Sequence, residues 1–167
     1  MIAGHLALTI AAVFSGAAIF VNLVEQPARF GLDDRALLAE WKPSYKRGAA
    51  MQAPLALAGF ALGLVAWWQT RDFLFLAGGI AMLANWPWTI LVIYPVNKIL
   101  MATEPEQAGA QTRALISKWG RLHAVRTALG FVAVIAFFCC LPFALTPNHE
   151  RIAEQSGEIG VAMKSAR

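Results

Sequence analysis

The side chains best suited to chemistry are three that recur with helical spacing in the last third of the sequence, Trp119, His123 and Arg126. Spacings of four and three residues place all three on one face of an α-helix. A histidine titrates near neutral pH and can accept a proton, whereas an arginine can stabilise a developing oxyanion. This segment therefore predicts a catalytic pair that removes a proton from a substrate and holds the resulting anion.

A carboxylate supplies an alternative base. Glu25 is followed one turn later by Arg29, so the two residues could form an ordinary ion pair along one helix. Glu25 could instead orient His123, neutralise Arg126, or act as the base itself while His123 orients it. We expect Glu25 and Arg126 to approach within salt-bridge or one-water distance, and the sequence does not choose between Glu25 and His123 as the base.

Further polar and aromatic side chains interrupt apolar segments, where exposure to lipid would be costly. They are expected to face the interior or a cavity and to contact a substrate. The alternatives are packing between helices, snorkelling and anchoring at the membrane interface. The candidates for substrate binding are Asn22, Arg29, Trp41, Tyr45, Gln52, Asn85, Trp86, Thr89, Asn97 and Trp119.

The composition excludes an ordinary soluble enzyme. Of the 167 residues, 58% are hydrophobic and only 14% are charged, whereas soluble domains carry about 25% charged residues. The net charge of +4 includes no basic run of the kind that binds nucleic acid. Orientation in a membrane and attraction to anionic headgroups explain this charge better. We therefore expect an integral membrane protein that does not bind nucleic acid.

Four apolar runs are long enough to cross a hydrocarbon core, which needs about 20 helical residues. The link between the second and third runs is so short that these helices should form a tight hairpin. The runs span about 2–24, 49–68, 73–96 and 124–145, and they define a membrane domain over 1–146 followed by a polar C-terminal tail over 147–167.

The other two links are long and amphipathic. In residues 33–47, Pro43 is expected to end or kink any helix. Thr103, followed by Pro105 and Glu106, has the pattern of a helix start, and this helix is expected to run into the fourth span. The predicted fold class is all-α: an antiparallel four-helix transmembrane bundle with two amphipathic surface helices, in the links between spans one and two and between spans three and four.

The distribution of basic residues predicts the orientation. Of the 14 lysines and arginines, Arg71, Arg151, Lys164 and Arg167 lie on the face that carries the termini, and the others lie on the face of the two long links. Because basic loops tend to stay in the cytoplasm, we expect the long links to be cytoplasmic and both termini to be outside, in a bacterial cytoplasmic membrane.

The same topology brings polar side chains from all four spans to one end of the bundle. We expect a pocket that opens near the long links and reaches inward to Asn85 and Thr89. Pro87 and Pro95 are expected to open the third span locally and to free backbone carbonyls. The converging residues are Asn22, Glu25, Gln52, Asn97, His123 and Arg126.

No motif specifies a cofactor or a metal. The nucleotide-binding glycine pattern, the phosphate-binding loop, the paired-cysteine motif and the helical zinc motif do not occur. His5 and His123 are expected at opposite ends of the bundle, where they could not ligate one haem. We therefore expect no cofactor and no metal site.

Several polar and aromatic motifs follow one another in a defined order along the chain. They are Asn22…Glu25-x-Pro27-x-Arg29, Trp41…Tyr45, Gln52, Asn85-x-Pro87-x-Thr89…Pro95-x-Asn97 and Trp119-x-x-x-His123-x-x-Arg126. Their order resembles the anthrone-oxygenase-like family over about residues 4–145, and the last motif is the most specific. Members of that family are small four-span membrane proteins, many of unknown function. Those with known activity are cofactor-independent oxygenases that oxidise polyketide anthrones to anthraquinones with molecular oxygen.

The resemblance implies an oxidoreductase that acts on a flat, acidic C–H substrate such as an anthrone, or on a quinol. An apolar small molecule or a lipid would then reach the site from the bilayer. The alternative is a non-enzymatic accessory subunit, or a lipid- or quinone-binding protein, within a homo-oligomer or a larger membrane complex. A cavity large enough for three fused rings favours the enzyme, whereas a polar cluster closed by direct side-chain pairing favours the alternative.

Overall fold

The computed structural model describes residues 2–141, and every regular element in that range is helical. The elements are α1 (Ile2–Phe20), a π-helical turn (Val21–Glu25), α2 (Gln26–Arg29), α3 (Asp34–Thr70), α4 (Phe73–Trp88), a second π-helical turn (Thr89–Ile93), α5 (Tyr94–Ala102), a 3-10 turn (Pro105–Gln107) and α6 (Ala110–Cys139). The all-α prediction is therefore confirmed for this part of the chain. The predicted tail over 147–167 lies outside the described residues.

Four helical stretches are long and apolar enough to cross a membrane, as predicted. They are Ile2–Arg29, Asp34–Thr70, Phe73–Ala102 and Ala110–Cys139. Each is longer on the side of the long links than the apolar run that predicted it, because the amphipathic flanks continue the helix instead of forming separate elements. These lengths and compositions fit an integral membrane protein.

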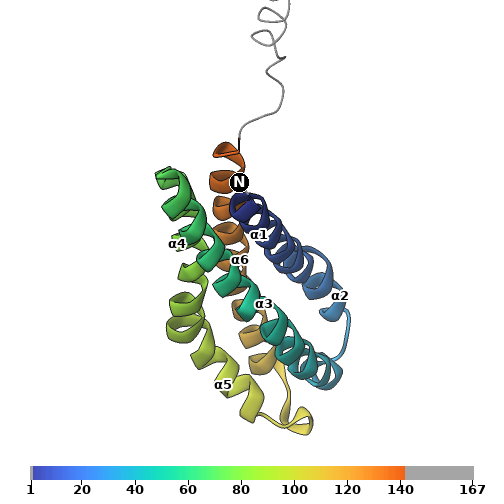
Figure 1. Ribbon diagram of the computed structural model, residues 1–167. Helices are drawn as coiled ribbons and strands as arrows, with labels where there is room; N and C mark the ends of the chain where they lie inside the picture. The colour runs from blue at the N-terminus through green and yellow to red at the C-terminus, as the bar shows by residue number, and fades with distance from the viewer. Residues whose placement is uncertain (1, 142–167) are drawn as a thin grey trace, which may run out of the picture.

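The long helices pack around a common centre. In Figure 1 the chain descends along α1, rises along α3, descends again along α4 and α5, and rises along α6. α1 and α4 each pack against both α3 and α6. Only Arg71 and Asp72 join α3 to α4. Arg71 reverses the chain in the left-handed conformation with φ 62°, and the carboxylate of Asp72 caps α4 by accepting from Leu74 N at 2.9 Å.

The first long link forms the beginning of α3. Pro43 was expected to end or kink a helix there, and it does not end one. The carboxylate of Asp33 caps the start of α3 by accepting from Ala36 N at 2.9 Å, and the helix continues through Pro43. A proline inside a helix costs roughly 3 kcal/mol. The complete burial of Leu37, Leu38 and Trp41 on this first part of α3 offsets that cost.

The second long link also differs from the prediction. Thr103 ends α5 instead of opening a new helix: its backbone is extended, with ψ 127°, and Pro105 two residues later cannot continue the helix. Its hydroxyl donates to Ile99 O at 2.9 Å. After the 3-10 turn, α6 begins at Ala110. The predicted continuous helix past Trp119 and His123 into the fourth span is confirmed, since α6 runs unbroken to Cys139.

Two apolar clusters occupy the two ends of the bundle. The first surrounds Phe14, Phe75, Met82 and Phe137. The second contains Leu37, Leu38, Trp41, Ile93, Val96, Leu100, Ile116 and Trp119. On α6 the second cluster ends at Trp119 and the first begins at Ala133, so His123 and Arg126 lie between them. The two clusters thus enclose the candidate site from both ends.

The two π-helical turns widen the helices next to that site. In each turn a backbone N–H donates five residues back, from Gln26 N to Val21 O and from Tyr94 N to Thr89 O. A proline follows each turn closely, Pro27 in the first case and Pro95 in the second. Local opening of the third span was expected at this position, and π-helical turns frequently occur at functional sites.

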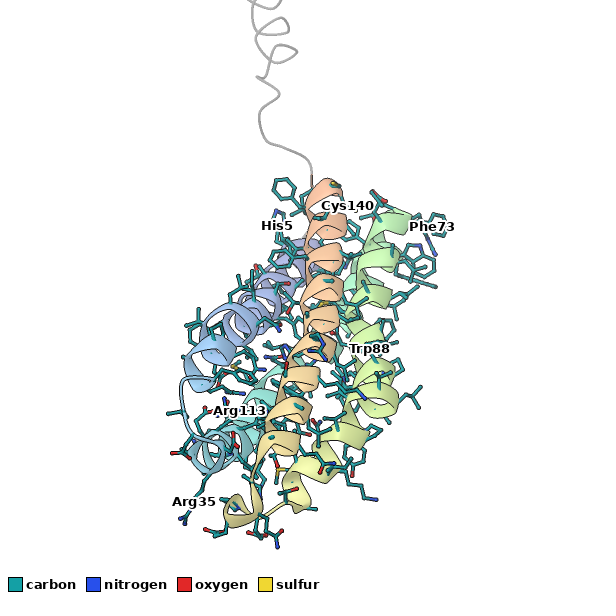
Figure 2. All side chains as sticks on the ribbon, turned by 180° about the vertical axis from the view of Figure 1, so that it is seen from behind. His5, Arg35, Phe73, Trp88, Arg113 and Cys140 are labelled. Atoms are coloured by element: carbon teal, nitrogen blue, oxygen red, sulfur yellow. The ribbon has the colours of Figure 1, made fainter. Side chains whose placement is uncertain are left out.

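Charged side chains gather at the end of the molecule that carries the two long links. Figure 2 shows Arg35 and Arg113 at that end, His5, Phe73 and Cys140 at the opposite end, and Trp88 between them. Arg113 links helices at this end, because its guanidinium donates to Asp34 Oδ1 at 2.5 Å and to Phe30 O at 3.1 Å. These contacts join α6 to the first residue of α3 and to the loop between α2 and α3.

Candidate functional site

His123 is buried and is held in one orientation by Asn22 from the first π-helical turn. The Asn22 side-chain nitrogen donates to Gly120 O at 2.8 Å, so its amide oxygen is the acceptor on the other side. The Thr127 hydroxyl donates to that oxygen at 2.8 Å, and His123 Nδ1 lies 3.0 Å from it. The network therefore assigns the proton to Nδ1. It leaves the lone pair on Nε2, which has no hydrogen-bond partner within residues 2–141.

Arg29 is also buried, and two carboxylates neutralise it. Its guanidinium lies 2.5 Å from Glu25 Oε1 and 2.9 Å from Glu40 Oε2. It donates to Ser44 Oγ at 3.0 Å, and the Ser44 hydroxyl in turn donates to Glu25. The ion pair between Glu25 and Arg29 that the sequence allowed is thus formed, and it is extended by Glu40 from α3.

Arg126 is buried and has no such partner. Its side chain is 8% exposed, and in the described part of the chain no carboxylate lies within ion-pair distance of it. Its guanidinium carbon lies 5.6 Å from the centre of the Phe14 ring, and its Nε atom makes no hydrogen bond there. The expected direct salt bridge between Glu25 and Arg126 is therefore not formed, because Arg29 and Ser44 bind the carboxylate.

An inner cavity of about 40 Å³ lies between these groups. It has room for a few water molecules but not for a ring system. Glu25 and Arg126 both line it, so they share a cavity although they do not pair. The side chains and backbone around it come from Val21, Glu25, Ser44, Tyr45, Gly48, Ala49, Gln52, Trp119, His123 and Arg126.

A wider outer groove runs between α1 and α3 and shares part of its lining with the inner cavity. Its volume is about 420 Å³, and apolar side chains such as Phe20 and Met51 form much of it. Arg47 adds one charge. The groove is lined by Ala17, Phe20, Val21, Glu25, Ser44, Arg47, Gly48, Met51 and Gln52. Glu25, Ser44 and Gln52 therefore face both the groove and the inner cavity.

A third cavity, which we call the alanine pocket, lies on the other side of Arg126. Its volume is about 120 Å³. It lies between α3 and the end of α4, and it includes three of the predicted site residues, Asn85, Trp86 and Thr89. The complete lining is Ala49, Ala53, Ala56, Asn85, Trp86, Thr89, Ile90 and Arg126. Ala49 and Arg126 therefore belong to both the inner cavity and the alanine pocket.

The aromatic candidates form a column beside the inner cavity. Trp41 stacks on Tyr45 with ring centres 5.0 Å apart, and its edge meets Trp119 at 5.6 Å. The Trp119 ring continues to His123 at 5.0 Å. Tyr45 and Trp119 line the cavity, whereas Trp41 is fully buried behind them. The column therefore packs against the imidazole through Trp119.

One predicted site residue lies apart from the others. Asn97 is 1% exposed, lines none of the cavities described above, and its side chain has no hydrogen-bond partner in the range 2–141. The expected convergence therefore holds for Asn22, Glu25, Gln52, His123 and Arg126 but not for Asn97.

Sequence reasoning missed four members of the site. Gln26 accepts from Arg29 at 3.0 Å and donates to Ile116 O at 3.2 Å, and Glu40, Ser44 and Gly48 lie on α3. A signal for the last three was present. Glu40, Ser44, Gly48 and the predicted Gln52 are spaced by four residues, so they follow one stripe of a helix. The expected break at Pro43 concealed this stripe.

No cluster of three or more histidine, cysteine, aspartate or glutamate side chains that could hold a metal ion occurs among the described residues. The side chains around the inner cavity include an imidazole, a carboxylate and a guanidinium. This set can move a proton and stabilise an anion.

The sequence model of the anthrone oxygenase family matches residues 41–136. The chain belongs to the anthrone oxygenase family. No curated protein and no solved structure matches it in the corresponding comparisons. The matched range contains the aromatic column, the alanine pocket, His123 and Arg126. Asn22, Glu25 and Arg29 precede that range, so the family match does not bear on them.

Proposed function

We propose that this protein is an integral membrane oxygenase that needs no cofactor and acts on a flat, acidic C–H substrate such as an anthrone. The observation that carries the proposal is the pairing of two buried groups around the inner cavity. Within residues 2–141, Arg126 has no carboxylate partner and His123 has an unpaired Nε2 lone pair, and both side chains line this cavity. Membership of the anthrone oxygenase family supports the same reaction.

We further propose an antiparallel four-helix transmembrane bundle with the amphipathic beginnings of α3 and α6 at the membrane surface. The alternating directions of α1, α3, α4 and α6 support this arrangement (Figure 1). The excess of basic residues on the face of the long links favours a cytoplasmic position for that face, in a bacterial cytoplasmic membrane with both termini outside.

The reaction uses two side chains, His123 and Arg126, together with dioxygen. His123 Nε2 takes a proton from the acidic carbon, and Arg126 stabilises the negative charge that spreads onto the substrate oxygen. The carbanion gives one electron to dioxygen, and the resulting radical and superoxide combine to form a C–O bond. The peroxide takes up a proton and loses water, which leaves a carbonyl. One dioxygen is consumed, and one water is formed for each anthrone oxidised to a quinone.

The outer groove is where we place the organic substrate. The inner cavity cannot hold three fused rings, whereas the groove offers about 420 Å³ and apolar walls. Glu25 and Gln52 line both spaces, so the reacting edge of a substrate in the groove would pass between them into the inner cavity, which His123 and Arg126 line. Because apolar side chains such as Phe20 line the groove, a flat apolar molecule could reach it from the bilayer.

The hydrogen bonds favour His123 over Glu25 as the base. Glu25 is already bound by Arg29 and by the Ser44 hydroxyl. His123 donates only through Nδ1, so its Nε2 is available. Glu25 then acts with Arg29 to shape the wall of the cavity.

Oxygen uptake by the purified protein in lipid nanodiscs, with a hydroxyanthrone as substrate, tests the proposal. We expect turnover in the wild type and none in His123→Ala, with thermal denaturation showing that the variant remains folded. Glu25→Gln should retain part of the activity, and Glu106→Gln, at an exposed position, serves as the matched control. If Glu25→Gln is inactive and His123→Ala is active, Glu25 is the base.

The second candidate is a non-enzymatic subunit that binds a quinone or a lipid within a homo-oligomer or a larger complex. The closed ion-pair cluster around Arg29 and the small inner cavity favour it. If the wild type shows neither oxygen uptake nor binding with any hydroxyanthrone or quinol, the oxygenase proposal is wrong. Co-purification of a stable partner or a bound lipid would then support this candidate.

A further inference from the structure

Three cavities lie near the buried Arg126, and their sizes suit different occupants. The outer groove is large enough for a ring system and the inner cavity for water. The alanine pocket, at about 120 Å³, is smaller than an engineered apolar cavity of roughly 150 Å³ that holds a single benzene ring. A tricyclic substrate therefore does not fit into it, whereas a diatomic gas does.

The lining of the alanine pocket suits an apolar gas better than water. Three methyl groups, from Ala49, Ala53 and Ala56, form its α3 side. The Asn85 side-chain nitrogen donates to Ala81 O and Met82 O, and its amide oxygen has no hydrogen-bond partner among the described residues. Apolar cavities can take up small apolar guests such as xenon, and alanine methyl groups make up the α3 side of this one.

The space results from three small side chains on one face of α3. Spacings of four and three residues place Ala49, Ala53 and Ala56 in a row, and a larger side chain at any of them would fill the volume. The outer wall is fixed because Trp86 Nε1 donates to Ala53 O at 3.2 Å. Ile90, on the same outer side, is 55% exposed, so the pocket lies next to the lipid-facing surface.

Arg126 closes the inner end of the alanine pocket and also lines the inner cavity. A buried cation without a carboxylate partner favours the formation of an anion beside it, because the low dielectric strengthens the attraction. Reduction of dioxygen by one electron produces such an anion, superoxide. The pocket thus joins an apolar compartment for a gas to a charge that stabilises its reduced form.

We infer that the alanine pocket is the dioxygen site of this protein, supplied from the bilayer, and that Arg126 stabilises the superoxide formed there. This inference rests on the proposed function. The substrate carbanion, whose reacting edge enters the inner cavity from the outer groove, gives one electron to dioxygen at Arg126. The substrate radical and superoxide then combine into a C–O bond, and the peroxide accepts a proton from the imidazolium of His123 before water is lost.

The occupant can be detected without turnover. Fluorine-labelled tryptophan placed throughout the chain reports on paramagnetic dioxygen, and a Trp86→Phe variant assigns the Trp86 resonance. We expect dissolved dioxygen to accelerate the relaxation of the Trp86 fluorine in wild-type protein in nanodiscs. Ala53→Leu, which fills the pocket, should remove most of this effect, and Ala53→Val should remove less. Ala50→Leu is the matched control, because Ala50 is exposed and lines none of the cavities described.

The kinetic consequence is specific to one of the two substrates. Ala53→Leu should raise the KM for dioxygen severalfold and leave the KM for the hydroxyanthrone close to that of Ala50→Leu.

Three outcomes would contradict parts of this inference. If the relaxation of the Trp86 fluorine is the same in Ala53→Leu and in the wild type, the alanine pocket is not the dioxygen site, whether or not the protein turns over. A pocket that loses dioxygen in Ala53→Leu while the KM for dioxygen stays unchanged would overturn its role in the reaction. Absence of any hydroxyanthrone turnover would instead overturn the proposed function and leave the relaxation result to decide the site.

Discussion

Two buried arginines in neighbouring parts of the bundle have opposite surroundings. Arg29 lies between Glu25 and Glu40 at 2.5 and 2.9 Å. Arg126 has no carboxylate within ion-pair distance among residues 2–141 and instead lines two cavities. Both have lost most of their contact with solvent. The first arginine is a fixed part of the structure, and the second is a charge available to a ligand.

The difference shows that a buried arginine has to be interpreted together with its partners. Desolvating a charge costs several kcal/mol, and an ion pair recovers much of that cost. An unpaired buried charge is a persistent loss of stability, so in a membrane protein it is by default a candidate for function. A third arginine extends the series, because Arg35 pairs with Glu106 at 2.6 Å at an exposed position.

Arg126 should show the largest effect, and on activity. We expect Arg126→Met to lower kcat/KM by about 10²–10³, which corresponds to about 2.7–4 kcal/mol of transition-state stabilisation. The free energy of unfolding in mixed micelles should stay the same or rise, because an unpaired charge is removed. Arg126→Lys should also lose most activity, since an ammonium group cannot reproduce the planar guanidinium.

Quinone formation and denaturation measured on the same preparations check this prediction. If Arg126→Met fails to fold while Arg126→Lys keeps full activity, the charge supports the structure and the contrast with Arg29 disappears.

Arg29 should show the largest effect on stability. Arg29→Met leaves Glu25 and Glu40 side by side without a cation, which should lower the free energy of unfolding by about 3 kcal/mol. Glu40→Gln is the control, and it should cost less because the Glu40 side chain is 38% exposed. Unfolding in mixed micelles measures both variants. Equal and small losses for Arg29→Met and Arg126→Met would show that the ion pairs around Arg29 contribute little.

Asn22 tests the orientation of the imidazole beside Arg126. Asn22→Leu has a similar shape but leaves His123 Nδ1–H and the Thr127 hydroxyl without their acceptor, which should cost about 1–3 kcal/mol of stability. Thr127→Val removes a single donor and should cost less. The pH dependence of kcat/KM should change in Asn22→Leu and not in Thr127→Val. An unchanged profile in both variants would mean that Asn22 does not set the tautomer of His123.

Arg35 should show the smallest effect. The side chains of Arg35 and Glu106 are 69% and 62% exposed, and exposed ion pairs contribute about 0–1 kcal/mol. Arg35→Ala should therefore change the free energy of unfolding by less than any variant above, and raised salt should reduce the difference further. A loss comparable to that of Arg29→Met would show that burial is not what separates the three arginines.

Helical periodicity predicted the part of the site that lies on α6. Trp119, His123 and Arg126 lie on one face of α6, as their spacing required, and the family match covers them. The boundaries of the long links were predicted less well. Pro43 and Thr103 have strong local preferences, but the burial of Leu37, Leu38 and Trp41 outweighed the first. Thr103 has an extended backbone and ends α5, so it is a helix end and not the predicted helix start.

The sequence by itself determined the helices, the four apolar stretches and the stripes that they carry, because these depend on residues close together along the chain. Tertiary structure alone decided that Glu40 from α3 joins Glu25 around Arg29, and that no carboxylate within residues 2–141 pairs with Arg126. It also decided that three small alanine side chains on α3 leave a pocket against Trp86 and Ile90. Ion pairs and cavities depend on atomic distances between helices, and those distances are set by the packing of the whole bundle rather than by spacing along one helix.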